Sequence, residues 1–109
     1  MDIIVDKRVF DKRQLFLTRV LARELYRELR AAGVTAEKLG EAVENLLFGI
    51  TAIVDGSRVM EDDGDRVVPV LMFGDDYPPK TVIGYGGTSF MHEYAMGIAE
   101  EVMEAAEGE

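Results

Sequence analysis

The chain has 109 residues and no cysteine, and its 21 acidic and 12 basic side chains give a net charge of −9 at pH 7. This length predicts one domain, residues 1–109, and an apolar fraction of 48% is enough to form a hydrophobic core. The composition excludes disulfides, zinc–thiolate sites and thiol nucleophiles, and its acidic balance argues against nucleic-acid binding, which needs clustered Lys and Arg.

The first predicted helix runs from about residue 11 to residue 32. Asp11 is a suitable N-cap, and Gln14 stands at the reciprocal position of a capping box. Phe10 precedes the cap, where it can pack against Leu15. Gly33 supplies the left-handed residue that commonly ends a helix. The residues expected to face the core recur at helical spacing: Leu17, Leu21, Leu25, Leu29 and Ala32.

A second helix is predicted to begin at Thr35 and to end at the Asp55–Gly56 pair. The short gap after Gly33 predicts that the two helices form an antiparallel hairpin. Gly49 lies inside this helix, where glycine costs about 1 kcal/mol relative to alanine. We therefore expect another element to approach the backbone closely at Gly49. The apolar positions are Leu39, Ala42, Val43, Leu46, Leu47, Ile50, Ile53 and Val54.

The pattern then changes to strands. Residues 57–60, 66–73 and 81–85 are strand candidates, and Asp63-Gly64 is typical of a tight hairpin turn between the first two. Short connections predict an antiparallel meander. Residues 2–5 are a further strand candidate, without an identified partner. A third helix is predicted from about residue 90 to residue 106.

The expected architecture is α+β. It consists of an N-terminal antiparallel helix hairpin, a small antiparallel β-meander and a C-terminal helix packed on the sheet.

The segment from residue 84 to residue 93, with the letters G-Y-G-G-T-S-F-M-H-E, contains the most chemically suggestive residues. A glycine-rich loop that opens a helix offers backbone N–H groups at the positive end of the helix dipole, which suits a small anion or carboxylate. The candidate ligand-binding residues are Tyr85, Gly86, Gly87, Thr88 and Ser89. His92, the only histidine, is a candidate general base beside Asp75 or Asp76, so His92 and Asp76 are the catalytic candidates. The alternative is an ordinary strand-to-helix connection with an exposed histidine.

Motifs for metals and cofactors are incomplete. A zinc-binding H-E-x-x-H motif fails because residue 96 is Met. The acidic run 61–65 lacks the spacing of a calcium loop, because the twelfth residue counted from Glu61 is Met72. The glycines at 84, 86 and 87 resemble a dinucleotide fingerprint only weakly, since Ser89 replaces the third glycine. We expect neither a metal nor a cofactor.

Two features predict self-association. Residues 67–73 are apolar on both faces, whereas an antiparallel strand with one face in water alternates. Pro69 places this strand at an edge or a bulge, because proline cannot donate a ladder hydrogen bond. In the first helix, Phe16 and Val20 lie away from the leucine stripe. The expected dimer interface therefore contains Phe16, Val20, Val68 and Val70. Alternatively, the strand is covered by helices on both sides and the pair is simply exposed.

Two functions follow from these patterns. The first is a non-catalytic, homodimeric binding or adaptor protein that acts through protein–protein interaction. The second is a small-anion or carboxylate ligand-binding protein, or an enzyme, with its site at residues 84–93. The acidic surface suits a basic protein partner, or serves only to keep the protein soluble. No apolar run approaches about 20 residues and the N-terminus is not a secretory signal, so we expect no membrane contact and a cytoplasmic location.

Overall fold

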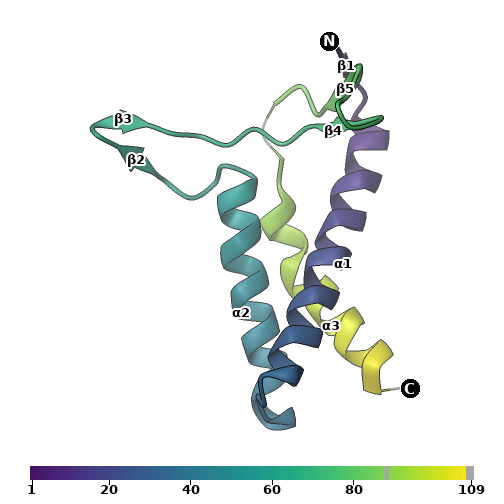
Figure 1. Cartoon of the computed structure of the whole chain (residues 1–109), viewed down its shortest axis with the longest axis vertical. Coiled ribbons are helices and arrows are strands. Elements are labelled where there is room, and N and C mark those ends of the chain that lie inside the picture. The colour runs from purple at the N-terminus through teal and green to yellow at the C-terminus, as the bar shows by residue number, and fades with distance from the viewer. Residues whose placement is uncertain (88, 108–109) are drawn as a thin grey trace.

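The computed structural model describes residues 1–87 and 89–107. Within them the chain forms three α-helices, one 3₁₀ turn and five short strands (Figure 1). The α+β class, the N-terminal helix hairpin and the C-terminal helix are all confirmed. The helices pack together as a body, with a three-stranded sheet at one end of it and a separate two-stranded hairpin that projects to the side.

Helix α1 spans Lys7–Ala31 and begins earlier than expected. Its N-cap is Asp6, whose carboxylate accepts a hydrogen bond from the backbone N–H of Val9 at 3.1 Å. The prediction of Asp11 as the cap is wrong, because Asp11 lies inside the helix and accepts from the Gln14 side chain at 2.7 Å. At the other end, Gly33 has a φ of +90°, as its position after the helix predicted.

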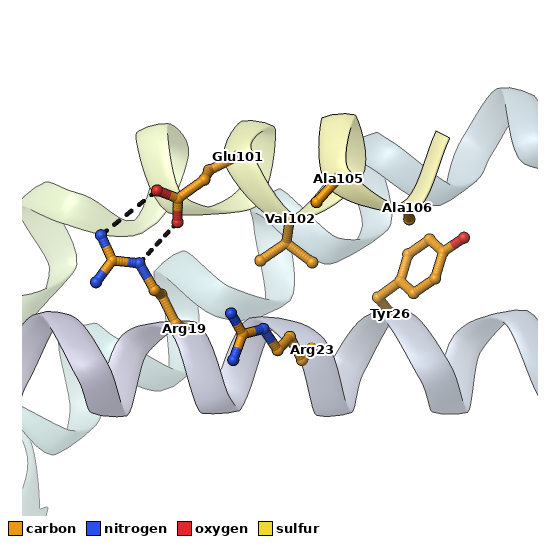
Figure 2. A pocket seen from close by; sticks show the side chains of 7 residues that line it. All are labelled: Arg19, Arg23, Tyr26, Glu101, Val102, Ala105 and Ala106. Carbon is orange, nitrogen blue, oxygen red and sulfur yellow. Dashed lines mark hydrogen bonds and ion pairs between the residues drawn. The ribbon is translucent and has the colours of Figure 1, made fainter. Parts of the chain in front are cut away.

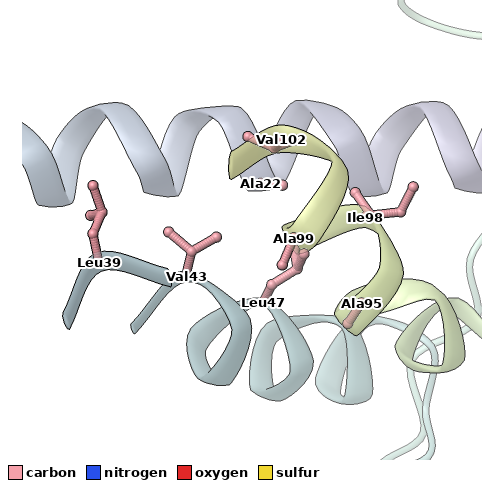
Figure 3. Close-up of a cluster of buried hydrophobic side chains, with 8 residues drawn as sticks. All are labelled: Ala22, Leu39, Val43, Leu47, Ala95, Ile98, Ala99 and Val102. Atoms are coloured by element: carbon pink, nitrogen blue, oxygen red, sulfur yellow. The ribbon is translucent and has the colours of Figure 1, made fainter. Parts of the chain in front are cut away.

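Helix α2 spans Ala36–Val54, and the 3₁₀ turn η1 (Met91–Tyr94) leads into α3 (Ala95–Glu107). Figure 3 shows the hydrophobic core where these helices meet. Its fully or nearly buried side chains are Ala22, Leu39, Val43, Leu47, Ala95, Ile98, Ala99 and Val102.

The buried face of α1 differs from the predicted stripe. It contains Phe10, Gln14, Thr18 and Ala22, while the expected leucines only flank the core. Polar residues are tolerated there because the Thr18 hydroxyl donates to the carbonyl of Gln14 one turn earlier, at 2.7 Å. Thr51 of α2 does the same with the carbonyl of Leu47, also at 2.7 Å.

The main sheet is mixed, in the order β1 (Asp2–Val5), β5 (Thr81–Gly84), β4 (Phe73–Gly74). Strand β1 pairs parallel with β5, and β4 pairs antiparallel with it. The antiparallel pairing expected for the strands that follow α2 is found for β4 with β5, whereas β1, for which the sequence identified no partner, adds a parallel strand. A parallel pair needs a long crossover, and here α1 and α2 supply it. The sheet meets the C-terminal segment at Tyr85 and Phe90, whose ring centroids lie 6.2 Å apart.

A hairpin formed by β2 (Glu61–Asp62) and β3 (Asp65–Arg66) projects from the C-terminal end of α2 (Figure 1). Its turn residues Asp63 and Gly64 have φ values of 50° and 84°, which confirms the predicted tight turn. The expected strands at 57–60 and 66–73 are wrong. Only their ends pair, because Pro69 lacks an N–H and the segment between β3 and β4 has no neighbouring strand. Residues 57–72 are called the arm below.

Candidate functional site

Asp55 and His92 form a buried pair at the point where the arm leaves the helical body. Asp55 is the C-cap of α2 and its side chain is fully buried, whereas His92 belongs to η1 and its side chain is 24% exposed. Atom Oδ2 of Asp55 lies 2.5 Å from Nδ1 of His92 and also accepts the His92 backbone N–H at 2.9 Å. Atom Oδ1 accepts the backbone N–H of Ser57 at 2.9 Å. One carboxylate therefore joins α2, η1 and the start of the arm.

The electrostatics of this carboxylate depend on its hydrogen bonds. Burial alone raises the pKa of Asp55, but the hydrogen bonds from His92 and Ser57 together lower that pKa below its ordinary value. The C-terminal end of a helix also disfavours a negative charge. An acidic residue at the C-terminal end of a helix therefore needs hydrogen-bond donors that stabilise its charge. Asp55 was such a signal in the sequence, and sequence reasoning missed it. Because an ionised carboxylate only accepts hydrogen bonds, Nδ1 of His92 carries a proton and the ring is held in one orientation.

The residues expected beside His92 lie elsewhere. The structure places Asp55, rather than Asp75 or Asp76, next to the ring. Asp76 is exposed and accepts the backbone N–H of Tyr77 at 2.8 Å. Asp75 accepts the N–H groups of Lys80 and Thr81 at 3.2 and 3.3 Å. These two acids organise the turn between β4 and β5. The catalytic role assigned to His92 and Asp76 stays a prediction.

The expected anion-binding loop leads into this pair. Gly86 and Gly87 are exposed, Ser89 is buried, and Thr88 lies outside the described residues. The Ser89 hydroxyl has no hydrogen-bond partner among the described residues. Tyr85 packs against Phe10, with ring centroids 5.6 Å apart. The N–H of His92 already binds Asp55, so an external anion would have to use other N–H groups of the loop. Ligand binding here stays a prediction.

Neither His92 nor Ser89 lines any of the five best-formed hollows on the described part of the chain. One, of about 310 Å³, lies between α1 and α3 (Figure 2). Its Arg19 is 2.7 Å from Glu101, which raises the pKa of Arg19 and lowers that of Glu101. Arg23 lines the same hollow (Figure 2) and forms no ion pair with the described residues, so one positive charge remains there.

A second hollow, of about 480 Å³, lies between α1 and the sheet. Its lining includes Arg13 and the apolar side chains of Phe16, Phe73 and Ile83. Phe16 is 59% exposed although it is a large aromatic side chain. Asp75 and Thr81 also line this hollow, so its wall is part apolar and part polar and carries one side chain of each charge. An exposed aromatic side chain in such a setting is typical of a protein interface.

The four expected interface residues are all on the surface. Phe16 and Val20 are exposed on α1, and Val68 and Val70 are exposed on the arm, with Val70 at 66%. Val67, in the apolar segment 67–73 that predicted self-association, is exposed as well. Sequence reasoning missed other exposed apolar residues: Val59 on the arm, Phe48 and Leu46 on α2, and Ile3 and Val5 on β1. The hydrophobic periodicity of α2 did not predict this exposed surface, because it assigned Leu46 to the core. Whether any of these residues contacts a second copy stays a prediction.

No protein-family model, no curated protein and no solved structure matches the chain. None of the described helices is both long and apolar enough to cross a bilayer. The function must therefore be inferred from the chemistry and the shape of the surfaces of the chain.

Proposed function

We propose that the protein is a non-catalytic, homodimeric binding or adaptor protein, and that the arm and the apolar side chains near it are covered by a second copy. The observation that carries this proposal is the surface area of the chain. Its accessible surface is 7616 Å², whereas a compact monomer of 12.1 kDa exposes about 6,000 Å². The excess of about 1,600 Å² is larger than the roughly 800 Å² that each partner buries in a standard interface.

The shape of the chain supports the same proposal. The radius of gyration is 15.6 Å, whereas a compact chain of this length has about 13 Å. The arm contributes to the difference, because its hairpin projects from the helices instead of packing on them (Figure 1). An isolated two-stranded hairpin is at best marginally stable in water, so an arm of this kind needs another surface.

The expected dimer is tested by light scattering on purified protein over a range of concentrations. Replacing Val59 and Val70 with Asp should shift the mass toward that of the 12.1 kDa monomer, because charged side chains would be buried in the interface. Met96→Asp is the matched control, since Met96 is similarly exposed but lies on α3. A parent chain that stays monomeric at every concentration would contradict the proposal.

The dimer leaves the remaining acidic surface free. Outside α1 the chain carries 18 acids and four bases, so a basic protein is the partner that this surface suits. A charge-reversed variant of that surface should lose such a partner while the dimer remains intact.

A second candidate function is binding of a small anion or carboxylate at residues 84–93, with His92 as the base. The ring of His92, oriented by Asp55, favours it, and so does the buried Ser89 hydroxyl, which has no hydrogen-bond partner within residues 1–87 and 89–107. Nuclear magnetic resonance spectra of the His92 ring and of the Gly86, Gly87 and Ser89 amides, recorded with and without phosphate or acetate, test it. Unchanged signals would leave the ordinary capped turn as the explanation.

A further inference from the structure

Charge is distributed unevenly along the chain. Helix α1 carries eight bases and three acids, so it has a local charge of +5 in a protein of −9. The tip of the arm, residues 61–66, carries four acids and one base. The two segments therefore have opposite charge, and both are on the surface.

The one base of the tip, Arg66, stands opposite Glu61 in the hairpin, so Asp62, Asp63 and Asp65 have no base facing them in the β2–β3 pair. Asp62 stands directly opposite Asp65 in the β2–β3 ladder, and like charges in facing positions destabilise a hairpin. None of the tip acids forms an ion pair within residues 1–87 and 89–107. The same holds there for Arg8, Lys12 and Arg13 in the N-terminal half of α1. Within the described residues, the tip therefore has acids without a paired base, and the N-terminal half of α1 has bases without a paired acid.

One chain does not bring them together. In Figure 1 the tip of the arm projects from the end of α2 to the side away from α1, and the second half of the arm then returns to β4. In a dimer with a two-fold axis beside α2, the tip of one copy can come close to α1 of the other copy. The outgoing half of the arm, residues 57–63, spans about 23 Å when extended. Packed helices are about 8–10 Å apart, so the tip of one arm can pass the neighbouring α2 and reach the α1 behind it. The symmetry makes the contact reciprocal.

The destination also offers apolar surface. The hollow beside Arg13 is lined by the apolar side chains of Phe16, Phe73 and Ile83 and also by Asp75, and the arm presents Val59 and Val67. The exposed start of α2 is a poor alternative for an acidic tip, because it carries Glu37 and Glu41 beside the single base Lys38. Charge therefore selects α1 over α2 as the surface that receives the tip.

We infer that in the homodimer the acidic tip of each arm binds the basic N-terminal half of α1 in the second copy, beside the hollow at Arg13 and Phe16. This inference rests on the proposed dimer and adds the partner of the arm. The arm of each copy is then ordered by its neighbour.

Charge reversal tests the contact. The first variant combines Asp62→Lys with Asp65→Lys, and the second combines Lys12→Glu with Arg13→Glu. Each variant alone should raise the dissociation constant of its homodimer at least about tenfold at low ionic strength, because like charges then face each other. A mixture of the two should form a heterodimer with nearly the parent affinity, since both reciprocal contacts are complementary in it. Glu104→Lys with Glu107→Lys on α3 is the control for net charge and should leave the parent affinity almost unchanged.

Cross-linking gives an independent readout. The chain has no cysteine, so Asp63→Cys in one tagged chain and Arg13→Cys in another leave a single disulfide that can join them. We expect this disulfide to form faster than the one between Asp63→Cys and Glu41→Cys on α2. The inference is overturned if the charge reversals leave the dissociation constant of the dimer unchanged, or if the disulfide to α2 forms faster. The proposed homodimer would survive either result. A parent chain that stays monomeric contradicts both the proposed function and this inference.

Discussion

The helical body and the arm are built in opposite ways. In the body, three helices contribute to one core in which Ala22, Val43 and Leu47 are completely buried. In the arm, none of the residues 57–72 is buried, although valine is its commonest residue type. The body thus contains the interactions that stabilise it, whereas the arm has apolar side chains without a surface to cover them. The difference indicates that the body is stable by itself and that the arm depends on a partner.

The largest expected effect tests the two sides of this comparison directly. Leu47→Ala removes a fully buried side chain from the core and should lower the free energy of unfolding by about 3 kcal/mol. Val59→Ala on the arm should change it by less than about 0.5 kcal/mol in the monomer. Urea unfolding at low protein concentration measures both. A large loss for Val59→Ala under these conditions would mean that the arm packs on its own chain.

A smaller effect is expected at the junction between the two regions. Asp55→Asn replaces a buried charged acceptor of hydrogen bonds from His92 and Ser57, and it should cost about 2–3 kcal/mol in the free energy of unfolding. Asp76→Asn is the matched control, because Asp76 is exposed and makes one local hydrogen bond. Equal stabilities of the two variants would contradict the structural role of Asp55.

The pH dependence of the same pair sharpens the test. The pKa of Asp55 in the folded protein lies below its ordinary value of about 4. The stabilisation from its charge is therefore complete above about pH 4 and is lost as the pH falls through the lower, folded-state pKa. The difference in unfolding free energy between the parent and Asp55→Asn should shrink as the pH falls below about 4. If this difference in unfolding free energy instead grows below about pH 4, the pKa of Asp55 in the folded protein is raised rather than lowered.

Local signals made much of the body predictable. Gly33 marks the end of α1, the apolar spacing locates α2, and Asp63-Gly64 specifies a turn with two positive φ angles. Each of these depends on a few neighbouring residues. The helix boundary at Asp6 was missed because Asp11 with Gln14 offers an equally good capping pattern, and only tertiary structure decides between them.

Long-range pairing was not predictable. Strand β1 pairs with a strand that follows two helices and the arm, and Asp55 meets a histidine 37 positions away. Nothing near either residue in the sequence identifies its partner. Residues 67–72 show the reverse error, because a high β-propensity produces a strand only where another strand is available to pair with it.

The smallest expected effect concerns Gly49, where the sequence predicted a close approach to the backbone. Within the chain that prediction is wrong, because the nearest atom to an added Cβ is the flexible end of Arg58, at 3.5 Å. Gly49→Ala should therefore stabilise the monomer by about 0.5–1 kcal/mol through helix propensity. Gly33→Ala is the matched control, since nothing crowds Gly33 but its φ of +90° is strained for alanine, so this variant should lose stability. If Gly49→Ala instead destabilises the monomer, a Cβ at position 49 is disfavoured for a reason that the packing of the body does not explain. If it stabilises the monomer but weakens the dimer, the close approach at Gly49 comes from the second copy.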